Sequence, residues 1–156
     1  MRRTDREITD GATIRAILDS CKVFRLAMSA ENVPYVVPLN YGYVFENGKY
    51  TVYFHCAQEG KKLDILRANN TVCFEMDTDH ELTTAESACG YGYNYSSIIG
   101  NGIVKILDDA EDKKNGLKIL MKHQTGKDFD FTDEQVAHVA VCRIDAAELT
   151  GKQRAK

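Results

Sequence analysis

The chain has 156 residues, of which 44% are hydrophobic and 28% are charged, and its net charge is −3. This length fits one domain over residues 1–156 and is sufficient to bury a core without disulfides or metals. The acidic balance gives no overall attraction to nucleic acid or to an anionic membrane, so any anionic ligand would need a local basic cluster.

The cysteines and the N-terminal segment indicate the cellular compartment. Five cysteines, an odd number, are widely spaced without a CxxC pair. This pattern favours reduced thiols and argues against a disulfide framework or a structural zinc site. The segment MRRTDREITD lacks the apolar stretch of a signal peptide, and no run approaches the ~20 apolar residues that span a bilayer. The sequence therefore predicts a cytoplasmic protein that does not enter a membrane.

The first half of the chain predicts one helix followed by strands. Thr9 or Asp10 caps the helix. Asn47-Gly48 predicts a tight hairpin turn, because both residues tolerate positive φ. Pro38 cannot donate to a sheet ladder, so it indicates an edge strand, a bulge or a place where something other than a strand pairs. The expected strands are residues 23–29, 35–45 and 49–55, with a turn at Glu31-Asn32.

The second half continues with mixed elements that do not alternate regularly. In chain order we expect a helix over 61–68, a strand over 71–76, a polar loop over 77–87, one or two strands within 91–107, a helix within 109–123 and a last strand over 138–144. Irregular alternation disfavours a doubly wound parallel sheet. The sequence predicts a mainly β, α+β fold: a closed or partly closed antiparallel barrel of six or seven strands with about three peripheral helices.

The strand over 49–55 ends at His55, and Cys56 follows it. Neighbouring residues of a strand point to opposite faces, so these two side chains cannot readily form a nucleophile–base pair. No sequence context typical of cysteine proteases surrounds them. Cys56 is therefore expected to be a small buried hydrophobe rather than a hydrolytic nucleophile.

The segment DTDHE (77–81) gathers three carboxylates and His80 in one short stretch. It lacks the spacing of an EF-hand loop, and the chain has no HExxH motif. A solvated acidic loop is the expected role, and no metal site is predicted.

The segment EGKK (59–62) opens the helix expected over 61–68. The first backbone N–H groups of a helix are unpaired and its dipole is positive there, so Gly60, Lys61 and Lys62 would together suit a phosphate group. Lysine is normally disfavoured at a helix N-terminus. The alternative is a surface charge pair tolerated because of the neighbouring Glu59.

The segment YGYNYSSIIG (91–100) places Tyr91, Tyr93 and Tyr95 at alternating positions, which puts them on one face of a strand. They could form a stacking surface for a planar ligand, a wet aromatic dimer interface or an ordinary cross-strand cluster.

Four segments in order resemble one family. They are MRRTDREIT with CKVFRLAM, the long block YVVPLNYGYVFENGKYTVYFHCAQEGKKLDILRANNTVCFEMDTDHEL, YNYSSIIGNG, and LKILMKHQTGKDF. The chain is similar to flavoproteins related to pyridoxamine 5′-phosphate oxidase, in the branch named for nitroimidazole resistance. The resemblance implies a split β-barrel and a homodimer with FMN at the interface.

The resemblance also implies roles for individual residues. Lys61 and Lys62, with Gly60, would hold the FMN phosphate, and His55 would face the flavin. Residues Pro38, Leu39, Asn40 and Tyr41 would run along the isoalloxazine ring. The segment Ser96, Ser97 and Ile98 would reach FMN from the other subunit, and His123 would be a further contact.

The activity implied is FMN-dependent oxidoreduction of a small acceptor, such as the nitro group of a nitroimidazole, with electrons from a nicotinamide or another donor. His55, whose ordinary pKa lies near neutrality, is the candidate for a catalytic acid or base. The alternative is a non-catalytic flavin- or haem-binding carrier or sensor of the same fold. The C-terminal LTGKQRAK lacks the arginine-rich substrate segment of true pyridoxamine phosphate oxidases, so oxidation of pyridoxamine phosphate is not expected.

Overall fold

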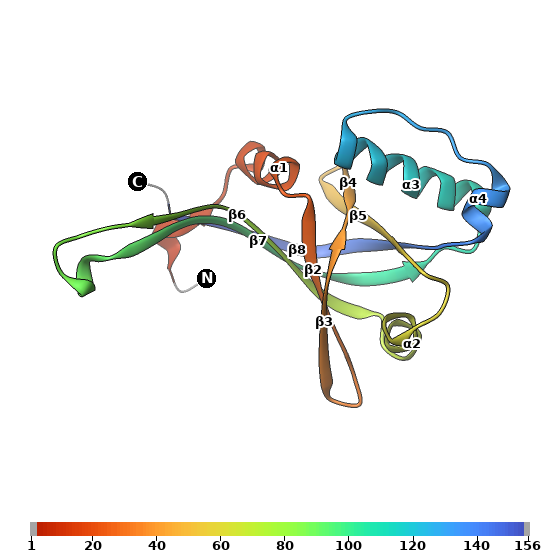
Figure 1. Ribbon diagram of the computed structural model, residues 1–156, viewed down its shortest axis with the longest axis horizontal. Coiled ribbons are helices and arrows are strands. Elements are labelled where there is room, and N and C mark those ends of the chain that lie inside the picture. Colours follow the sequence, from red (N-terminus) through yellow and green to blue (C-terminus); the bar gives the residue numbers. More distant parts are fainter. Residues whose placement is uncertain (1–2, 155–156) are drawn as a thin grey trace.

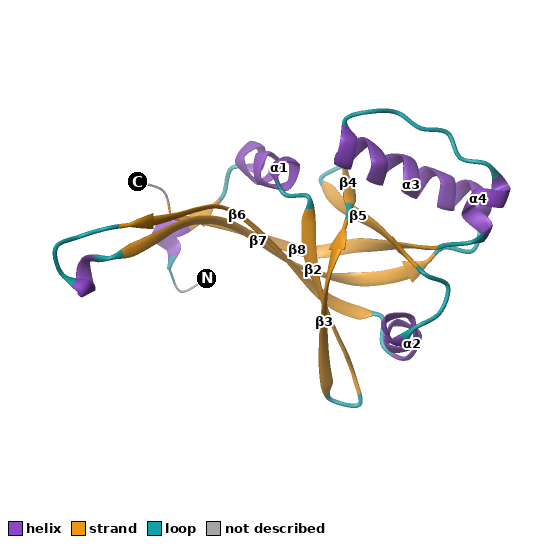
Figure 2. Cartoon of the chain, in the orientation of Figure 1, coloured by secondary structure: helices purple, strands orange, loops and turns teal. Residues whose placement is uncertain are grey.

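Eight strands in the described part of the chain form one antiparallel sheet (Figures 1 and 2). The computed structural model describes residues 3–154; residues 1, 2, 155 and 156 of the expected domain lie outside it. The sheet order is β3-β2-β6-β7-β8-β5-β4, and β1 pairs with β8. The strands are β1 (Glu7–Ile8), β2 (Val23–Ala30), β3 (Val33–Asn40), β4 (Gly42–Glu46), β5 (Lys49–Cys56), β6 (Thr71–Thr83), β7 (Gly92–Ile106) and β8 (Ala140–Arg154).

The helices lie at the periphery of this sheet (Figure 2). They are α1 (Gly11–Ser20), α2 (Lys61–Ala68), α3 (Ala110–Thr125) and α4 (Asp133–Ala137), with 3-10 turns at Thr4–Arg6 and Ala88–Gly90. Asp10 caps α1 by accepting from the backbone N–H groups of Ala12 and Thr13, which confirms the expected start. Asp109 caps α3 in the same way, and Gly126 ends it in the left-handed conformation.

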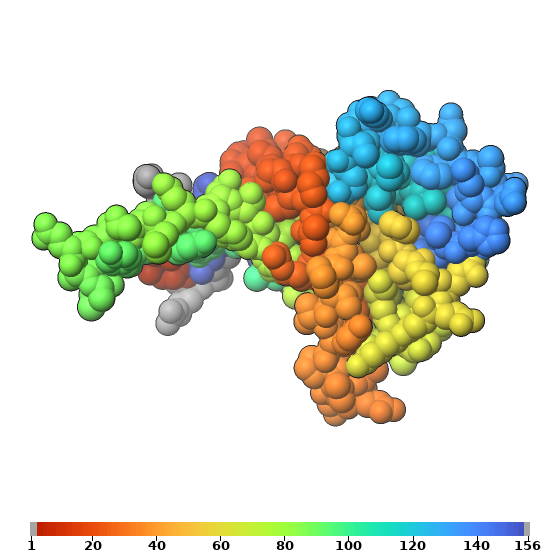
Figure 3. Space-filling view, viewed as in Figure 1, coloured from red at the N-terminus to blue at the C-terminus, as the bar shows by residue number. Residues whose placement is uncertain are grey.

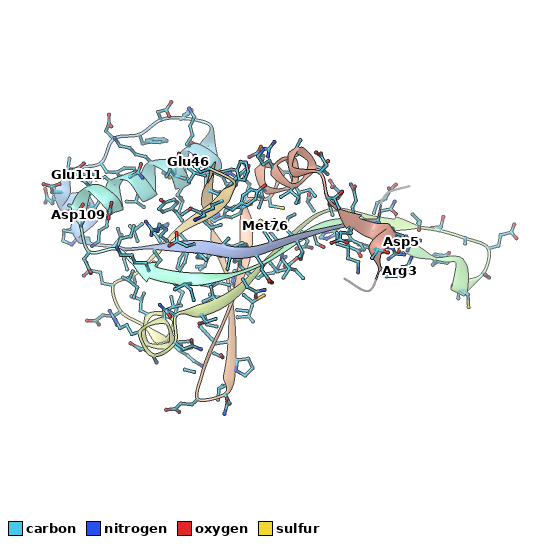
Figure 4. The ribbon with its side chains drawn as sticks, turned by 180° about the vertical axis from the view of Figure 1, so that it is seen from behind. Arg3, Asp5, Glu46, Met76, Asp109 and Glu111 are labelled. Atoms are coloured by element: carbon cyan, nitrogen blue, oxygen red, sulfur yellow. The ribbon has the colours of Figure 1, made fainter. Side chains whose placement is uncertain are left out.

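The core lies inside the curled sheet and is rich in aromatic rings. Phe24, Phe54 and Phe74 are completely buried, and the ring of Phe24 lies 5.8 Å from that of Phe54 and 6.3 Å from that of Phe74. Met76, labelled in Figure 4, is also completely buried. These side chains come from three different strands, so their packing fixes the curvature of the sheet.

The barrel is split between β3 and β4, which are the two edges of the sheet although they are consecutive in the chain. The predicted strand over 35–45 is therefore two strands, and Tyr41 forms the corner between them. Tyr41 is fully buried and its hydroxyl donates to the Leu18 carbonyl at 2.7 Å. Pro38 lies on the edge strand β3, where a missing N–H costs no ladder bond. The split β-barrel expected from the sequence is confirmed, but the described residues form eight strands rather than the expected six or seven, because the short β1 pairs with β8.

A long arm built on β6 and β7 projects from the body of the molecule (Figures 1 and 3). The polar loop expected over 77–87 is wrong for residues 77–83, where β6 continues to Thr83 and pairs with β7, and is confirmed for residues 84–87. Its polar side chains are compatible with a strand because residues 79–82 are exposed to solvent. The register shifts between Thr78 and Glu81, where Asp79 has a φ of 60°. Figure 4 places Arg3 and Asp5 at the base of the arm, at the opposite end from Asp109 and Glu111.

The last strand differs most from expectation. The sequence predicts it over 138–144, whereas β8 runs from Ala140 to Arg154. Its second half is polar, but it pairs with β7 as far as Arg154 and with β1 at Gly151 and Lys152. The two hairpin turns are confirmed, with positive φ at Glu31, Asn32, Asn47 and Gly48. No helix among residues 3–154 is both long and apolar enough to cross a membrane.

Candidate functional site

Helix α2 begins without a side-chain cap. Gly60 occupies the N-cap position with a φ of 130°, a value that side chains rarely tolerate, and within residues 3–154 no side chain hydrogen-bonds this end. The N–H groups of Leu63 and Asp64 donate to the Gly60 carbonyl. The N–H groups of Lys61 and Lys62 precede them in the first turn, where α-helical amides have no partner within the helix. The start of α2 therefore offers donors and a positive dipole end to an anion.

A hollow of about 210 Å³ lies directly at this helix start. The Lys61 ammonium lies 4.5 Å from the centre of the Tyr35 ring, which positions it over the hollow by a cation–π contact. Gly60 leaves its side open, since nothing lies within 4 Å of where a Cβ would be. The lining residues are Tyr35, Val37, Cys56, Ala57, Glu59, Gly60, Lys61, Lys62 and Leu63.

The chemistry of this hollow fits a phosphate group. Two lysine ammonium groups, free amides and a glycine that permits close approach are the donors that a phosphate requires. Glu59 is the one carboxylate in the lining. The predicted residues Gly60, Lys61 and Lys62 are thus brought together in one concave site, henceforth the GKK pocket.

His55 lies at the surface beside the GKK pocket, and its side chain points away from the core face on which Cys56 packs. The predicted separation of these two side chains is therefore confirmed. Neighbouring groups partly desolvate the His55 ring and the Lys62 ammonium opposes its protonation, so the pKa of His55 is lower than usual. His55 is thus predominantly neutral at pH 7 and can accept a hydrogen bond.

The four residues expected along the flavin ring occupy the end of β3 and the corner after it. Leu39 packs toward the core, while Pro38 and Asn40 face solvent. The Asn40 amide donates to the Lys22 carbonyl at 3.2 Å and to the Gln124 side chain at 3.3 Å. Tyr41 is buried, so it can support this segment but its side chain cannot contact a ligand directly.

His123 lies in a different hollow from the two lysines. Its Nε2 lies 2.8 Å from the Cys21 carbonyl, and its ring centre lies 4.6 Å from that of Tyr41. It lines an open groove of about 600 Å³ between α1, β4 and α3. The contact with Tyr41 gives His123 a packing role at the corner of the split barrel.

The segment Ser96, Ser97 and Ile98 lies in the middle of β7 and does not line the GKK pocket of the same chain. Ile98 is completely buried in the core, and the Ser96 hydroxyl accepts from Gln153 at 3.0 Å. Ser97 is half-buried on the opposite, outward face of β7. Of the three side chains, that of Ser97 is the best placed to reach a neighbouring molecule.

Within the acidic segment at 77–81, Asp77 contacts two basic side chains. Asp77 contacts Arg25 and pairs with His80 at 2.5 Å. Among residues 3–154, no group of three or more His, Cys, Asp or Glu side chains is placed to hold a metal ion.

Acidification is expected to destabilise the fold through His123. Burial lowers the pKa of His123 below its ordinary value of 6.5, and the hydrogen bond to the Cys21 carbonyl offsets only part of that effect. The unfolded chain therefore takes up a proton at higher pH than the folded chain, so stability present above pH 6.5 is lost as the pH falls through the folded pKa. Urea unfolding at about pH 7.5 and about pH 5.5 should show a smaller loss for His123→Gln than for the wild type.

The control for this experiment is His138→Gln, which replaces an exposed histidine. It should lose as much stability as the wild type on acidification. An equal loss in His123→Gln and in the wild type would contradict the assignment.

The comparisons with known proteins agree with this fold. The model of the pyridoxamine 5′-phosphate oxidase family matches residues 10–153, and the chain therefore belongs to that family. Its structure is similar to that of a Bacteroides thetaiotaomicron protein assigned to 5-nitroimidazole antibiotic resistance. That protein is 32% identical, with a TM-score of 0.81 over 94% of this chain and 86% of the other. The comparison with curated proteins found no match.

Two more distant structures share the fold alone. One is the flavocytochrome Anf3 from Azotobacter vinelandii, 21% identical with a TM-score of 0.81 over 100% of this chain and 72% of the other. The second is an FAD- and haem-binding protein from Mycobacterium smegmatis, 15% identical with a TM-score of 0.83 over 97% and 74%.

Sequence reasoning did not single out Tyr35 and Val37, which form the β3 wall of the GKK pocket. Their two-residue spacing in a strand places both on one face, so the sequence already indicated that these two side chains lie together. The sequence could not show that this face meets the start of α2, because that contact depends on the path of the chain.

Proposed function

We propose that the protein is an FMN-dependent oxidoreductase that transfers electrons from a reduced nicotinamide or another donor to a small acceptor. The nitro group of a nitroimidazole is the candidate acceptor. The observation that carries this proposal is the GKK pocket, an uncapped helix start with two lysines in a chain of the pyridoxamine 5′-phosphate oxidase family. Similarity to the Bacteroides protein supports the choice of acceptor.

In this proposal the chain binds and orients the cofactor, while the flavin, when bound, supplies the redox chemistry. Lys61, Lys62 and the first amides of α2 hold the phosphate. The free edge of β3 at Pro38 and Asn40 would border the ring. A flavin placed between these two sites would lie against a rigid strand and a helix start, which limits its movement.

His55 is the residue of this chain best suited to hold a proton near the flavin. Its lowered pKa keeps it neutral at pH 7. One ring nitrogen would then accept a hydrogen bond while the other donates one. His55 is exposed and is not among the residues that line the pocket, but it directly precedes Cys56, which is one of them. We therefore assign it an orienting role, with proton transfer as its further candidate role.

The assembly proposed is a homodimer with FMN at the interface. In one subunit the GKK pocket is small, with a volume of about 210 Å³, and the segment Ser96–Ile98 lies elsewhere on the sheet. A second copy could therefore cover the flavin with the outward face of its β7. Analytical ultracentrifugation with and without FMN tests this assembly.

The experiment that tests the function uses purified protein reconstituted with FMN. The bound flavin should lose its yellow absorption under anaerobic NADH and regain it when a 5-nitroimidazole is added, with loss of the nitro absorbance. Flavin that binds but is neither reduced by NADH nor reoxidised by the nitro compound would favour a carrier or sensor. The distant FAD- and haem-binding neighbour makes haem worth including as a second ligand, read by its Soret band.

A further inference from the structure

Two cysteines lie on neighbouring strands at the edge of the GKK pocket. Cys56 ends β5 and Cys142 lies on the adjacent strand β8, where the register pairs Cys56 with Ala140 and Phe54 with Cys142. Opposite residues of antiparallel strands share a face, so both thiols point toward the core from diagonal positions. These positions bring the two thiols close enough for a hydrogen bond between them to influence the pKa of each.

The two cysteines differ in access. Cys142 is completely buried, whereas Cys56 is half-buried and lines the GKK pocket. A small reagent entering the pocket can therefore reach Cys56 but not Cys142. This differs from the expectation that Cys56 is an ordinary core hydrophobe.

The surroundings of the pair favour a thiolate on Cys56. The hydrogen bond from Cys142 lowers the pKa of Cys56 below its ordinary value. Partial burial opposes this effect, and the positive charges of Lys62 and Arg67 add to it. The pKa of Cys142 is raised by the same hydrogen bond and by burial, so it remains protonated and acts as the donor. Cys73, by contrast, has a pKa raised by burial and by Glu75.

We propose that Cys56 and Cys142 form a redox-active thiol pair that hydrogen peroxide converts to an intramolecular disulfide. Cys56 is the attacking thiol and Cys142 is the resolving thiol. This pair is distinct from the proposed flavin chemistry and does not require bound FMN.

The steps balance with one peroxide. The Cys56 thiolate attacks a peroxide oxygen, an S–O bond forms, the O–O bond breaks, and the departing hydroxide takes a proton from solvent to leave as water. The Cys142 sulfur then attacks the Cys56 sulfur, an S–S bond forms, the S–O bond breaks, and the proton of Cys142 leaves with the second water. Two electrons from the thiol pair reduce one peroxide to two waters.

The geometry permits this bridge with a small movement. Diagonal positions on neighbouring strands lie slightly farther apart than most disulfides prefer. Cys56 is the last residue of β5 and leads directly into the loop at 57–60, so its backbone can shift without breaking the interior of the sheet. The shift would also move the wall of the GKK pocket, which couples oxidation to anion binding.

The test is peptide mass spectrometry after exposure of the reduced apoprotein to one equivalent of hydrogen peroxide, with differential alkylation of the thiols. In the wild type we expect a disulfide-linked Cys56–Cys142 peptide. The exposed Cys89 serves as the internal reference and should oxidise more slowly than Cys56, by a factor on the order of ten. In Cys142→Ala, Cys56 should stop at a sulfenic acid that dimedone traps. In Cys56→Ala, Cys142 should stay reduced.

Oxidation of Cys56 at the rate of Cys89 would overturn the proposal. A wild-type product in which Cys56 is oxidised while Cys142 remains a free thiol would overturn it as well. Circular dichroism of each variant establishes that it is folded, and Cys142→Ser replaces Cys142→Ala if the alanine variant is not. Failure of this proposal can be distinguished from failure of the proposed flavin function, because the flavin test is performed on the reduced wild-type protein.

Discussion

Replacing Lys61 and Lys62 together with alanine is expected to weaken FMN binding by at least about two orders of magnitude. Each charge-assisted hydrogen bond to a phosphate contributes about 1.5–3 kcal/mol, and the substitution removes two ammonium groups from the GKK pocket. Quenching of FMN fluorescence during titration measures the dissociation constant. Because Tyr35 and the amides of α2 remain, the variant should retain weak binding.

The ligand and the charge provide two controls. Riboflavin lacks the phosphate, so its affinity should be nearly equal for the variant and the wild type. The double variant Lys49→Ala/Lys127→Ala removes the same net charge from exposed lysines outside the pocket and should bind FMN as the wild type does. Equal FMN affinity of the Lys61→Ala/Lys62→Ala protein and the wild type would contradict the phosphate assignment.

Gly42→Ala is expected to destabilise the fold by about 3 kcal/mol, at the upper end of what overpacking costs. A Cβ at Gly42 would lie 2.5 Å from the Leu120 Cα and 2.6 Å from the Ile119 carbonyl oxygen. These are backbone atoms of α3, so the whole helix would have to move away from β4. Urea unfolding measures the loss as a lower midpoint with an unchanged slope.

Gly11→Ala is the matched control for this substitution. The nearest atom to a Cβ at Gly11 is the flexible guanidinium of Arg15 at 3.3 Å, and alanine favours the helix that begins there. This variant should be as stable as the wild type or slightly more stable. Equal stability of Gly42→Ala and Gly11→Ala would contradict the close approach of α3 to β4.

The features that the sequence predicted correctly depend on neighbouring residues. The bounds of α2 agree at both ends with the predicted 61–68, because Gly60 and the apolar positions after it are local signals. Asn47-Gly48 forms the predicted hairpin, and Pro38 marks an edge strand. The GKK pocket was predictable for the same reason, since its donors are consecutive in the chain.

The features that the sequence did not predict depend on partners far away in the chain. Residues 145–154 are polar and show no alternation that would distinguish a strand from a loop. They are extended because β7 and β1 pair with them. The outer half of β6 has the same explanation, since its partner is the start of β7. His123 was placed with the flavin by resemblance, whereas its contact with Tyr41 follows from the corner between β3 and β4.

The position of β8 has a consequence for biosynthesis. The last strand in chain order lies between β7 and β5 in the sheet, so the β4–β5 hairpin has no ladder to the other strands until β8 arrives. During translation, β2, β3, β6 and β7 can pair as they emerge, but the nascent sheet remains in two pieces, with the apolar inner face of β5 uncovered. Barrel closure is therefore a late event, and mutations in β8 should slow folding and expose the nascent chain to chaperones more than equal mutations in β2.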